Sequence, residues 1–393
     1  MANPRLNQNI LLSPVENGYV AYDTAQDRIH ELNTVAALIA ELCDGTRSIA
    51  AVRALAEPFV PQGKLSEIDR WIEGAVEAGL LVQNGDLPGP GKVMDAQALS
   101  GLSARLRENG KTQTAYLCAK RVVELAPNDG EAWCAMAELA HIVGQRDQAR
   151  IGYEKYLQSF PHDAEVRHIL TALRDEAPPA RVPDECIQQL YRKFSAFYES
   201  NMVDTLGYQG PERLGDLLRA VLGERGGLRV LDLGCGTGLS GLSLKPWAAH
   251  LTGVDLSPEM VEKARARGIY DRLEVAEITD WLSRGQEQYD LIVACDTLIY
   301  FGDLAPVMGA VRNRLKEGGL LAVSVERGEH GPYRLTDSGR YAHHKDHLAE
   351  AAACMDFRQL RVEEGFLRTE YGKDVIGLFA VMQKKPDRRR TQA

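Results

Sequence analysis

The sequence predicts an α/β protein in three parts: a small α+β module, a short helical repeat and a doubly wound α/β domain. Three features predict this: a strand-like run ending in a glycine-rich turn at 230–238, a 34-residue periodicity between 110 and 163, and short strand-like runs at 9–31. A chain of 393 residues is also too long for one ordinary core. The expected domains are residues 1–86, 95–178 and 184–393.

The composition is that of a soluble globular protein, with 45% hydrophobic and 26% charged residues. No run of eighteen apolar residues occurs, and the start MANPRLNQNILL lacks a signal-peptide pattern, which predicts a cytoplasmic protein without a membrane partner. The seven cysteines form no C-x-x-C pair, so neither a disulfide framework nor a structural metal site is expected. The net charge of -9 argues against nucleic acid as a partner.

The amino-terminal part begins with three strand-like runs, ILLSPV, GYVAYD and DRIHEL, which predict an antiparallel meander. Three amphipathic helices are expected to follow, at Asn33–Cys43, Ser48–Phe59 and Leu65–Ala78. Asn33, Ser48 and Ser66 are the candidate N-caps. This order of elements predicts a winged-helix-like module. DNA binding is disfavoured, because residues 1–90 carry six basic and twelve acidic side chains.

The segment HELNTVAALIAELCDGTRSIAAV, together with the later EAGLLV, resembles the pyrroloquinoline-quinone biosynthesis peptide-chaperone family. The domain of that family is the leader-recognition element of many enzymes that modify ribosomal peptides. The resemblance implies that a leader peptide adds as a strand to an exposed sheet edge. That edge would be Arg28–Leu32, with Arg28 and Ile29 in contact with the peptide. An apolar groove would be lined by Ile68, Trp71, Ile72 and Ala75, although these four could equally form only the core face of their helix.

A Pro/Gly-rich segment, Asn84–Lys92, is the expected first linker, and Arg174–Pro183 is the second. Between them the chain repeats every 34 residues: Gly110 recurs as Gly144, Ala115 as Ala149, Pro127 as Pro161 and Asp129 as Asp163. This pattern, with ELAPNDGEAW, resembles tetratricopeptide repeats, whose helix pairs bury their faces by stacking. Such a short array could be a spacer or a peptide groove, and nothing in its sequence marks a ligand.

The carboxy-terminal part is organised around VLDLGCGTG, Val230–Gly238, and LTGVDLSPEM, Leu251–Met260. An apolar strand runs into glycines that permit positive φ and a close approach of the backbone to a ligand. The second run reads as the neighbouring parallel strand, and it ends in Asp255, which is placed to bind ribose hydroxyls. The spacing D-x-G-x-G-x-G differs from the dinucleotide pattern G-x-G-x-x-G.

These two runs resemble the first and second motifs of class I S-adenosylmethionine (SAM) methyltransferases, which have a Rossmann-like fold. The resemblance implies that SAM is the cofactor, with Asp232 near its cationic amino-acid end. Glu277 would accept from the adenine amine, Ile278 would flank the ring, and Tyr191 and Tyr198 would cover the cofactor. The full set of expected cofactor residues is Asp232, Gly234, Cys235, Gly236, Gly238, Asp255, Leu256, Met260, Glu277, Ile278, Cys295, Tyr191 and Tyr198.

The remaining sequence continues this pattern. YDLIVAC predicts a strand at Tyr289–Cys295, LKEGG and LLAVSVE predict a turn and a strand, and the last segment predicts a hairpin. Because DTLIY replaces the N/D-P-P-Y/F sequence of nucleobase amine methyltransferases, nucleobase methylation is disfavoured. LGYQGP, DTLIYFGDL and GPYRLTDSGRYAH resemble tetratricopeptide-containing putative methyltransferases over about 189–385, which leaves the substrate open.

Candidate catalytic groups come from GRYAHHKDH, which holds three of the nine histidines. Tyr341 and His343 are expected to face the substrate and accept a proton from it, and Arg340 could hold a substrate carboxylate. Asp296 and Glu326 are the next candidates for catalysis, and Tyr300 is a candidate for substrate binding. A merely solvated loop is an open alternative. Metal binding by His343, His344 and His347 is another open alternative. The spacing could bring His343 and His347 onto one helical face, but no H-E-x-x-H pattern or third ligand accompanies them.

The favoured hypothesis is a methyltransferase that modifies a ribosomally made precursor peptide captured by the first module. One alternative is a small-molecule or protein methyltransferase in which that module only mediates contacts. Another is a SAM-binding partner protein without transferase activity of its own. The sequence leaves open which atom is methylated and whether the chain forms a homodimer.

Overall fold

The computed structural model describes residues 3–15, 18–57, 60, 66–83, 95–108, 110–370 and 373–386. The expected linker Asn84–Lys92 and the expected helix ends Phe59 and Leu65 lie outside these residues. Internal contacts divide the chain into two units, Met1–Phe160 and Pro161–Ala393. Among the described residues, no helix has the length and apolar character needed to cross a membrane.

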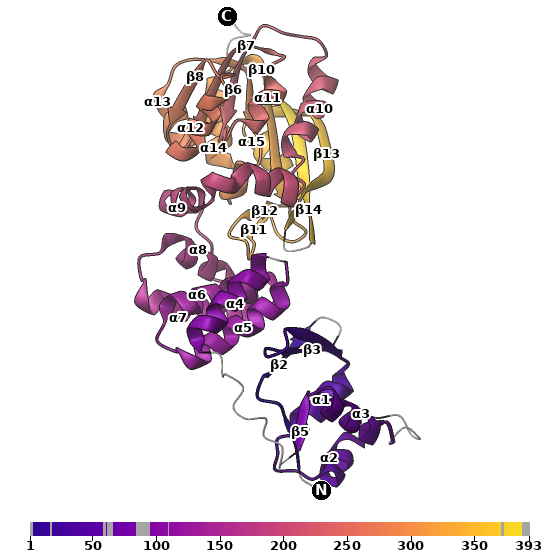
Figure 1. The fold of residues 1–393 in the computed structure, drawn as a ribbon. Coiled ribbons are helices and arrows are strands. Elements are labelled where there is room, and N and C mark those ends of the chain that lie inside the picture. Colours follow the sequence, from indigo (N-terminus) through magenta and orange to yellow (C-terminus); the bar gives the residue numbers. More distant parts are fainter. Residues whose placement is uncertain are drawn as a thin grey trace, which may run out of the picture. The chain divides into compact units, whose positions relative to one another are not determined.

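The first unit begins with the predicted antiparallel meander (Figure 1). Its strands are β2 (Ile10–Val15), β3 (Gly18–Asp23) and β4 (Arg28–Leu32), and its helices are α1 (Thr34–Leu42), α2 (Ile49–Ala56) and α3 (Ser66–Glu77). Asn33 and Ser48 cap α1 and α2 as predicted, since their side chains accept from the N–H groups of Ala36 and Ala51. Ser66 is instead the first residue of α3.

One sheet of this module was not predicted. β1 (Pro4–Leu6) pairs antiparallel with β5 (Leu81–Gln83), which ties the two ends of the module together. The core between sheet and helices includes Ala21, Ile39 and Val52.

The helical repeat follows, with α4 (Ala96–Glu108), α5 (Thr112–Leu125), α6 (Gly130–Ile142) and α7 (Arg146–Ser159). The 34-residue period is visible in its local structure. Gly110 and Gly144 both have positive φ, of 73° and 78°, where one helix ends and the next begins. Asp129 caps α6 as Asp163 caps α8 (Ala164–Leu173), the first helix of the second unit. The repeat therefore uses the same turn and cap chemistry in successive copies.

The second unit reaches its sheet through an irregular helical segment. α9 (Asp184–Phe194) is followed by a 3-10 turn at Ser195–Phe197, a π-helical turn at Ser200–Thr205 and α10 (Gly210–Leu222). The amphipathic stretch predicted here is therefore interrupted twice.

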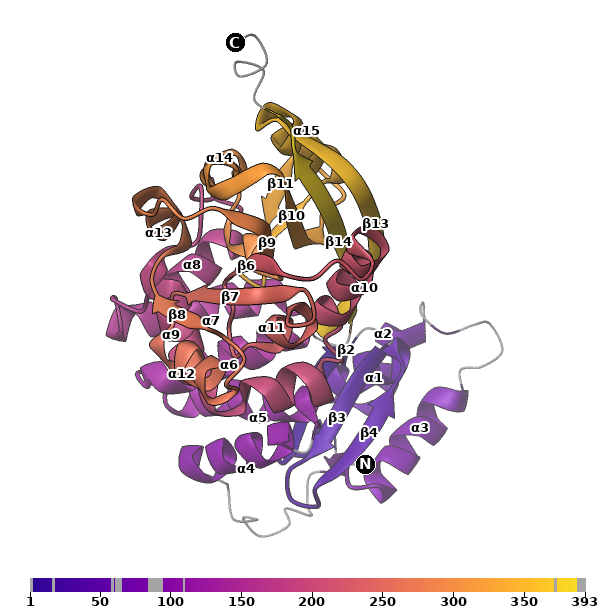
Figure 2. The same ribbon diagram turned by 90° about the horizontal axis from the view of Figure 1, so that it is seen from above.

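The sheet of the second unit has the doubly wound order that the sequence predicts (Figure 2). The parallel strands lie in the spatial order β8 (Arg272–Val275), β7 (Ala248–Asp255), β6 (Leu228–Leu233), β9 (Tyr289–Ala294) and β10 (Leu315–Arg327). The predicted final hairpin, β13 (Phe357–Glu370) and β14 (Lys373–Lys384), extends the sheet antiparallel from β10. β12 (Tyr341–His343) pairs parallel with the end of β10, and β11 (Tyr333–Leu335) pairs with β12.

Successive residues of the buried strands point to opposite faces of the sheet. Val230 belongs to the core formed with α10 and α11 (Leu239–Leu244), and Leu231 belongs to the core on the other face. That second face is covered by α13 (Ile278–Arg284), α14 (Ala305–Arg314) and α15 (Lys345–Cys354), while α12 (Pro258–Ala266) follows β7. A sheet buried on both faces explains the continuous apolar runs in the sequence.

Candidate active site

A pocket lies at the carboxyl ends of the central strands, next to β6, which pairs with β7 on one side and with β9 on the other. This is the switch point where open α/β sheets bind ligands. Eleven of its wall residues are among those expected from the sequence: Tyr191, Tyr198, Gly234, Gly236, Asp255, Leu256, Glu277, Ile278, Cys295, Asp296 and Tyr300. The sequence reasoning missed Arg181, Ile187, Tyr208, Thr297 and Phe301.

The glycine turn after β6 forms one wall. Gly234, Gly236 and Gly238 have φ values of 67°, 53° and 91°, as the motif predicts. A Cβ on Gly234 would lie 2.3 Å from Thr297 Oγ1, so no larger residue fits there. A Cβ on Gly236 would meet no atom within 4 Å. The backbone at Gly236 therefore borders open space in the pocket, where a ligand can approach it.

Asp255 at the end of β7 fixes this turn. Its Oδ2 accepts from the Gly236 N–H at 2.8 Å, and its Oδ1 accepts from the Ser257 N–H at 2.9 Å. Burial raises the pKa of this carboxyl, and the backbone hydrogen bonds oppose that rise. Because each carboxylate oxygen can accept more than one hydrogen bond, Asp255 can hold the turn and still bind ligand hydroxyls.

Asp232, which is expected near the cationic end of the cofactor, is buried and is not among the residues of the described pocket wall. The carboxylate is fully buried, and its Oδ2 accepts from Ser240 at 2.8 Å and from Tyr270 at 2.7 Å. Burial raises the pKa of Asp232 to about 6. Asp232 therefore joins Ser240, which follows the glycine turn, to Tyr270, while its Oδ1 is buried without a hydrogen-bond partner among the described residues. Cys235, Gly238 and Met260 are likewise buried and are not part of the described pocket wall.

Glu277 and Ile278 begin α13 on the side expected for adenine. Glu277 is the N-cap of that helix, and its Oε2 accepts from the Asp280 N–H at 2.7 Å. Its other oxygen, Oε1, lies 3.8 Å from Arg181 Nη1. Only 13% of the Glu277 side chain is exposed, and Ile278 is buried. Glu277 is thus held in place at the pocket.

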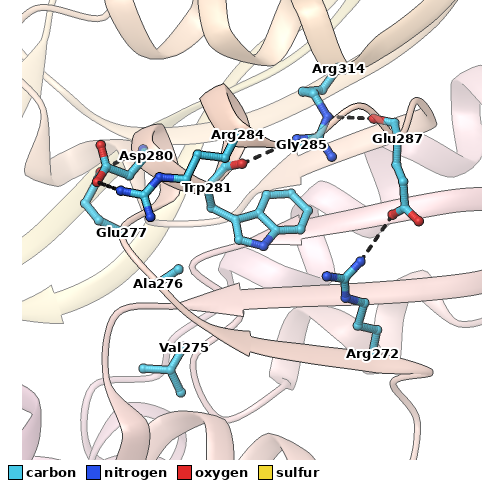
Figure 3. Close-up of a pocket in the computed structure, with 10 residues that line it drawn as sticks. All are labelled: Arg272, Val275, Ala276, Glu277, Asp280, Trp281, Arg284, Gly285, Glu287 and Arg314. Carbon is cyan, nitrogen blue, oxygen red and sulfur yellow. Dashed lines mark hydrogen bonds and ion pairs between the residues drawn. The ribbon is translucent and has the colours of Figure 1, made fainter.

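Glu277 also borders a second cavity of ≈ 430 Å³, around Trp281 (Figure 3). The charged groups of this cavity bind one another: Arg284 lies 3.1 Å from Asp280, Arg272 lies 3.5 Å from Glu287, and Arg314 Nε donates to the Glu287 carbonyl at 2.6 Å. Arg314 also packs over the Trp281 ring, 4.8 Å from its centroid. The contact of Arg314 with Trp281 joins α14 to α13.

Tyrosines from the segment before β6 cover the pocket, as expected. Tyr191 and Tyr198 are in edge contact, with ring centroids 5.8 Å apart. The Tyr191 hydroxyl is hydrogen-bonded to the Tyr300 hydroxyl at 2.7 Å, which joins α9 to the residues after β9. Tyr208 adds a further ring, and its hydroxyl lies 3.4 Å from Cys295 Sγ.

Asp296 stands at the end of β9 with an unusual backbone, φ 54°. Its N–H donates to Ser324 Oγ at 2.8 Å, and its Oδ2 lies 3.0 Å from Arg368 Nη1. Its Oδ1 is buried without a hydrogen-bond partner among the described residues. Such a group is costly unless a ligand or water donates to it. Asp296 is therefore the strongest candidate for contact with a substrate.

Arg368 joins Asp296 to a buried network of charges. Its guanidinium is 1% exposed, forms an ion pair with Glu326, and lies 3.4 Å from Glu370 Oε2. Arg340 Nη1 donates to the two Glu370 oxygens at 2.6 Å and 2.8 Å, and it lies 3.9 Å from Glu326 Oε1. Burial raises the pKa of Glu326, and the two arginines oppose this rise. Arg340 is thus occupied by carboxylates of the chain itself.

Tyr341 and His343, the first catalytic candidates, lie away from the pocket wall. The expected loop is the buried strand β12, and neither side chain is exposed. The Tyr341 hydroxyl donates to the Pro179 carbonyl, and the His343 ring stacks on His347 with centroids 5.6 Å apart. Burial lowers the pKa of His343 to about 4, which keeps it neutral. Both residues therefore pack the core here.

The expected peptide-binding surface is brought together only in part. Ile29 is 44% exposed on β4, the strand that also holds Arg28, and within the described residues β4 pairs only with β3. Trp71 on α3 is half-buried. Ile72 is 1% exposed and lies in the module core with Ile68 and Ala75. These last three form the core face of the helix and do not line a groove.

The residues of the pocket wall have the chemistry that the expected cofactor needs. Gly236 leaves room for a ligand against the backbone, Asp255 offers carboxylate oxygens, and the tyrosines supply aromatic faces for a cation. Leu256 and Ile278 lie on the same wall, as flanks for a flat base require.

Comparisons with known proteins match the part of the chain that contains this pocket. Residues 206–363 match the family model described as "Methyltransferase domain". A ubiquinone biosynthesis O-methyltransferase of Xylella fastidiosa is 34% identical over 153 residues, which are 37% of this chain and 62% of that protein. A malonyl-[acyl-carrier protein] O-methyltransferase of Acetivibrio thermocellus is 35% identical over 106 residues, 26% of this chain and 38% of that protein.

The chain spans less than two thirds of the length of these relatives. Among solved structures, a Burkholderia thailandensis 1,6-didemethyltoxoflavin-N1-methyltransferase shows 21% identity and a TM-score of 0.42, covering 53% of this chain and 93% of its own.

Proposed function

We propose that this chain, whose residues 206–363 form a class I SAM-dependent methyltransferase domain, transfers a methyl group from SAM to an acceptor. One observation carries the proposal: the glycine turn leaves open space at Gly236, and that space is bordered by a buried carboxylate, Asp255, at the switch point of the sheet. When bound, SAM supplies an electrophilic methyl group whose bond to sulfur breaks as the acceptor forms a new bond to carbon.

The residues of the chain contribute mainly by positioning. Asp255 and the backbone at Gly236 orient the adenosine part, and Glu277 and Ile278 border the space for the base. The tyrosine cover keeps water from the site, which matters because the transfer needs two groups held in line at close range. Asp296 lines the same pocket, and its Oδ1, which has no hydrogen-bond partner among the described residues, can accept a proton from the acceptor.

We further propose that the acceptor is a precursor peptide, held through its leader by residues 1–86. The available edge of β4, the exposed Ile29 and the half-buried Trp71 support this, since an extended peptide can pair with an open strand. Binding the leader there would raise the local concentration of the rest of the peptide at the methyltransferase domain. The helical repeat would then act as a spacer.

Co-expression of the full chain with any short peptides encoded beside its gene tests this proposal, with mass spectrometry of the peptides as the readout. A gain in mass of one or more methyl groups is expected. Ile29→Asp should reduce methylation by weakening leader binding, whereas Leu125→Asp, on an exposed leucine of α5, should not. Methylation that is equal in both variants would refute leader capture at β4. Tight SAM binding without transfer to any peptide would instead favour a small-molecule acceptor or a partner protein without transferase activity.

A further inference from the structure

The buried charge network reaches the pocket at Asp296. The carboxylate is aimed by three features: a left-handed backbone, a hydrogen bond from its N–H to Ser324 Oγ at 2.8 Å, and Arg368 Nη1 at 3.0 Å from Oδ2. The remaining oxygen, Oδ1, is buried and has no hydrogen-bond partner in the part of the chain that the structure describes. An ionised carboxylate oxygen can only accept, so a group that donates a hydrogen bond suits this position.

The charges around Asp296 favour a cation. The network contains three carboxylates, of Asp296, Glu326 and Glu370, and two guanidiniums, of Arg340 and Arg368. Fully ionised, these groups leave one negative charge uncompensated in a buried site. An acidic acceptor would add a second negative charge and would meet an oxygen that cannot donate to it.

The walls next to Asp296 point to the same class of ligand. Tyr198, Tyr208 and Tyr300 line the pocket together with Asp296. Burial raises the pKa of each of these phenols, so the rings are neutral and their faces can attract a cation. A carboxylate beside aromatic faces suits an ammonium group better than a carboxylate or an apolar carbon.

We propose that the methyl acceptor is an amine whose nitrogen binds Asp296 Oδ1, and that Arg368 is the positioning residue that orients this carboxylate. The inference rests on the proposed methyl transfer and narrows its acceptor to a lysine side chain or a free amino terminus of the peptide. Asp296 Oδ1 takes one proton from the ammonium form, and the freed lone pair forms the bond to the methyl carbon while the carbon–sulfur electron pair stays with sulfur. A methylated ammonium group and a neutral thioether result.

Binding of three small probes to the full chain tests whether the pocket prefers an amine. The protein is saturated with S-adenosylhomocysteine and titrated calorimetrically with benzylamine, benzyl alcohol and benzoate, which differ only in their head groups. Benzylamine is expected to bind at least about tenfold more tightly than the other two. Asp296→Asn should weaken benzylamine about 10- to 100-fold, the usual cost of losing a charged hydrogen bond, with little change for S-adenosylhomocysteine. No preference for benzylamine, or an unchanged preference in Asp296→Asn, would overturn the proposal.

Arg368→Lys tests the positioning role, because lysine keeps the charge but lacks the planar fork that holds Asp296 and Glu326 together. The planar guanidinium of Arg368 orients Asp296, so its loss should lower the affinity for benzylamine about tenfold. The affinity for S-adenosylhomocysteine should be retained. Arg361→Met, on an exposed arginine of the same strand, should change neither affinity. If Arg368→Lys lowers only the melting temperature, Arg368 is merely structural. If the wild type does not bind S-adenosylhomocysteine, the proposed methyl transfer itself fails.

Discussion

Gly236→Ala should lower the affinity for the ligand in addition to the stability of the fold. At φ 53° an alanine adopts a left-handed backbone, which destabilises the folded protein by about 1–2 kcal/mol. Its Cβ would meet no protein atom within 4 Å, so no further loss of stability is expected. For a unit of this size that destabilisation lowers the melting temperature by roughly 2–8 °C. The new methyl group would occupy ligand space, and overpacking of about 1–3 kcal/mol predicts a roughly 5- to 150-fold loss of S-adenosylhomocysteine affinity.

The matched control is Gly227→Ala. Gly227 precedes the amino end of β6, far along the strand from the pocket, has φ 78°, and its Cβ would also meet nothing within 4 Å. Both variants should therefore lose similar stability in melts followed by circular dichroism, but only Gly236→Ala should lose affinity in calorimetry. Equal affinity for S-adenosylhomocysteine in the two variants would refute the argument that Gly236 borders the ligand.

Three further predictions concern single side chains. Asp255→Asn cannot accept from both backbone N–H groups, so S-adenosylhomocysteine affinity should fall at least about tenfold in calorimetry, and an unchanged affinity would contradict the role of Asp255. Burial lowers the pKa of His343 to about 4 in the folded protein, whereas an unfolded histidine has a pKa of about 6.5. The unfolded chain therefore binds a proton first, and the folded protein loses stability as the pH falls from about 6.5 to 4. As the pH falls through that range, the free energy of unfolding of His343→Phe, measured with urea, should rise by about 3 kcal/mol relative to that of the wild type. A difference between the two proteins that does not change with pH would refute the argument that His343 is buried in its neutral form. Trp71→Ala should weaken leader binding to the full chain in calorimetry without changing S-adenosylhomocysteine affinity, and loss of both would indicate a folding defect.

The parts of the fold that could be predicted from sequence depend on local patterns. The strand before the glycine turn and the caps at Asn33 and Ser48 follow from residues within a few positions of one another. The turns at Gly110 and Gly144 follow from the 34-residue period, which repeats one local pattern. The pairing of β1 with β5 was missed because it joins three-residue strands from opposite ends of the module.

The site residues that the sequence did not reveal also depend on contacts between distant parts of the chain. No local pattern marks Arg368 as a site residue, since its partners Asp296 and Glu326 come from distant positions in the chain. Arg368 is buried because the fold places β13 beside the residues that end β9 and β10. Tyr341 and His343 lie in a polar, histidine-rich segment that reads as a loop, but pairing with β10 and cover by β11 bury them. Ile72 has the spacing of a groove residue, and the same spacing also serves the core.

A crystal structure of the full chain with S-adenosylhomocysteine would show whether the space beside Gly236 receives SAM. We expect the ribose at Asp255 and the adenine between Leu256 and Ile278. Density for the ligand elsewhere, or a Gly236 turn closed by side chains with no ligand bound, would contradict this expectation.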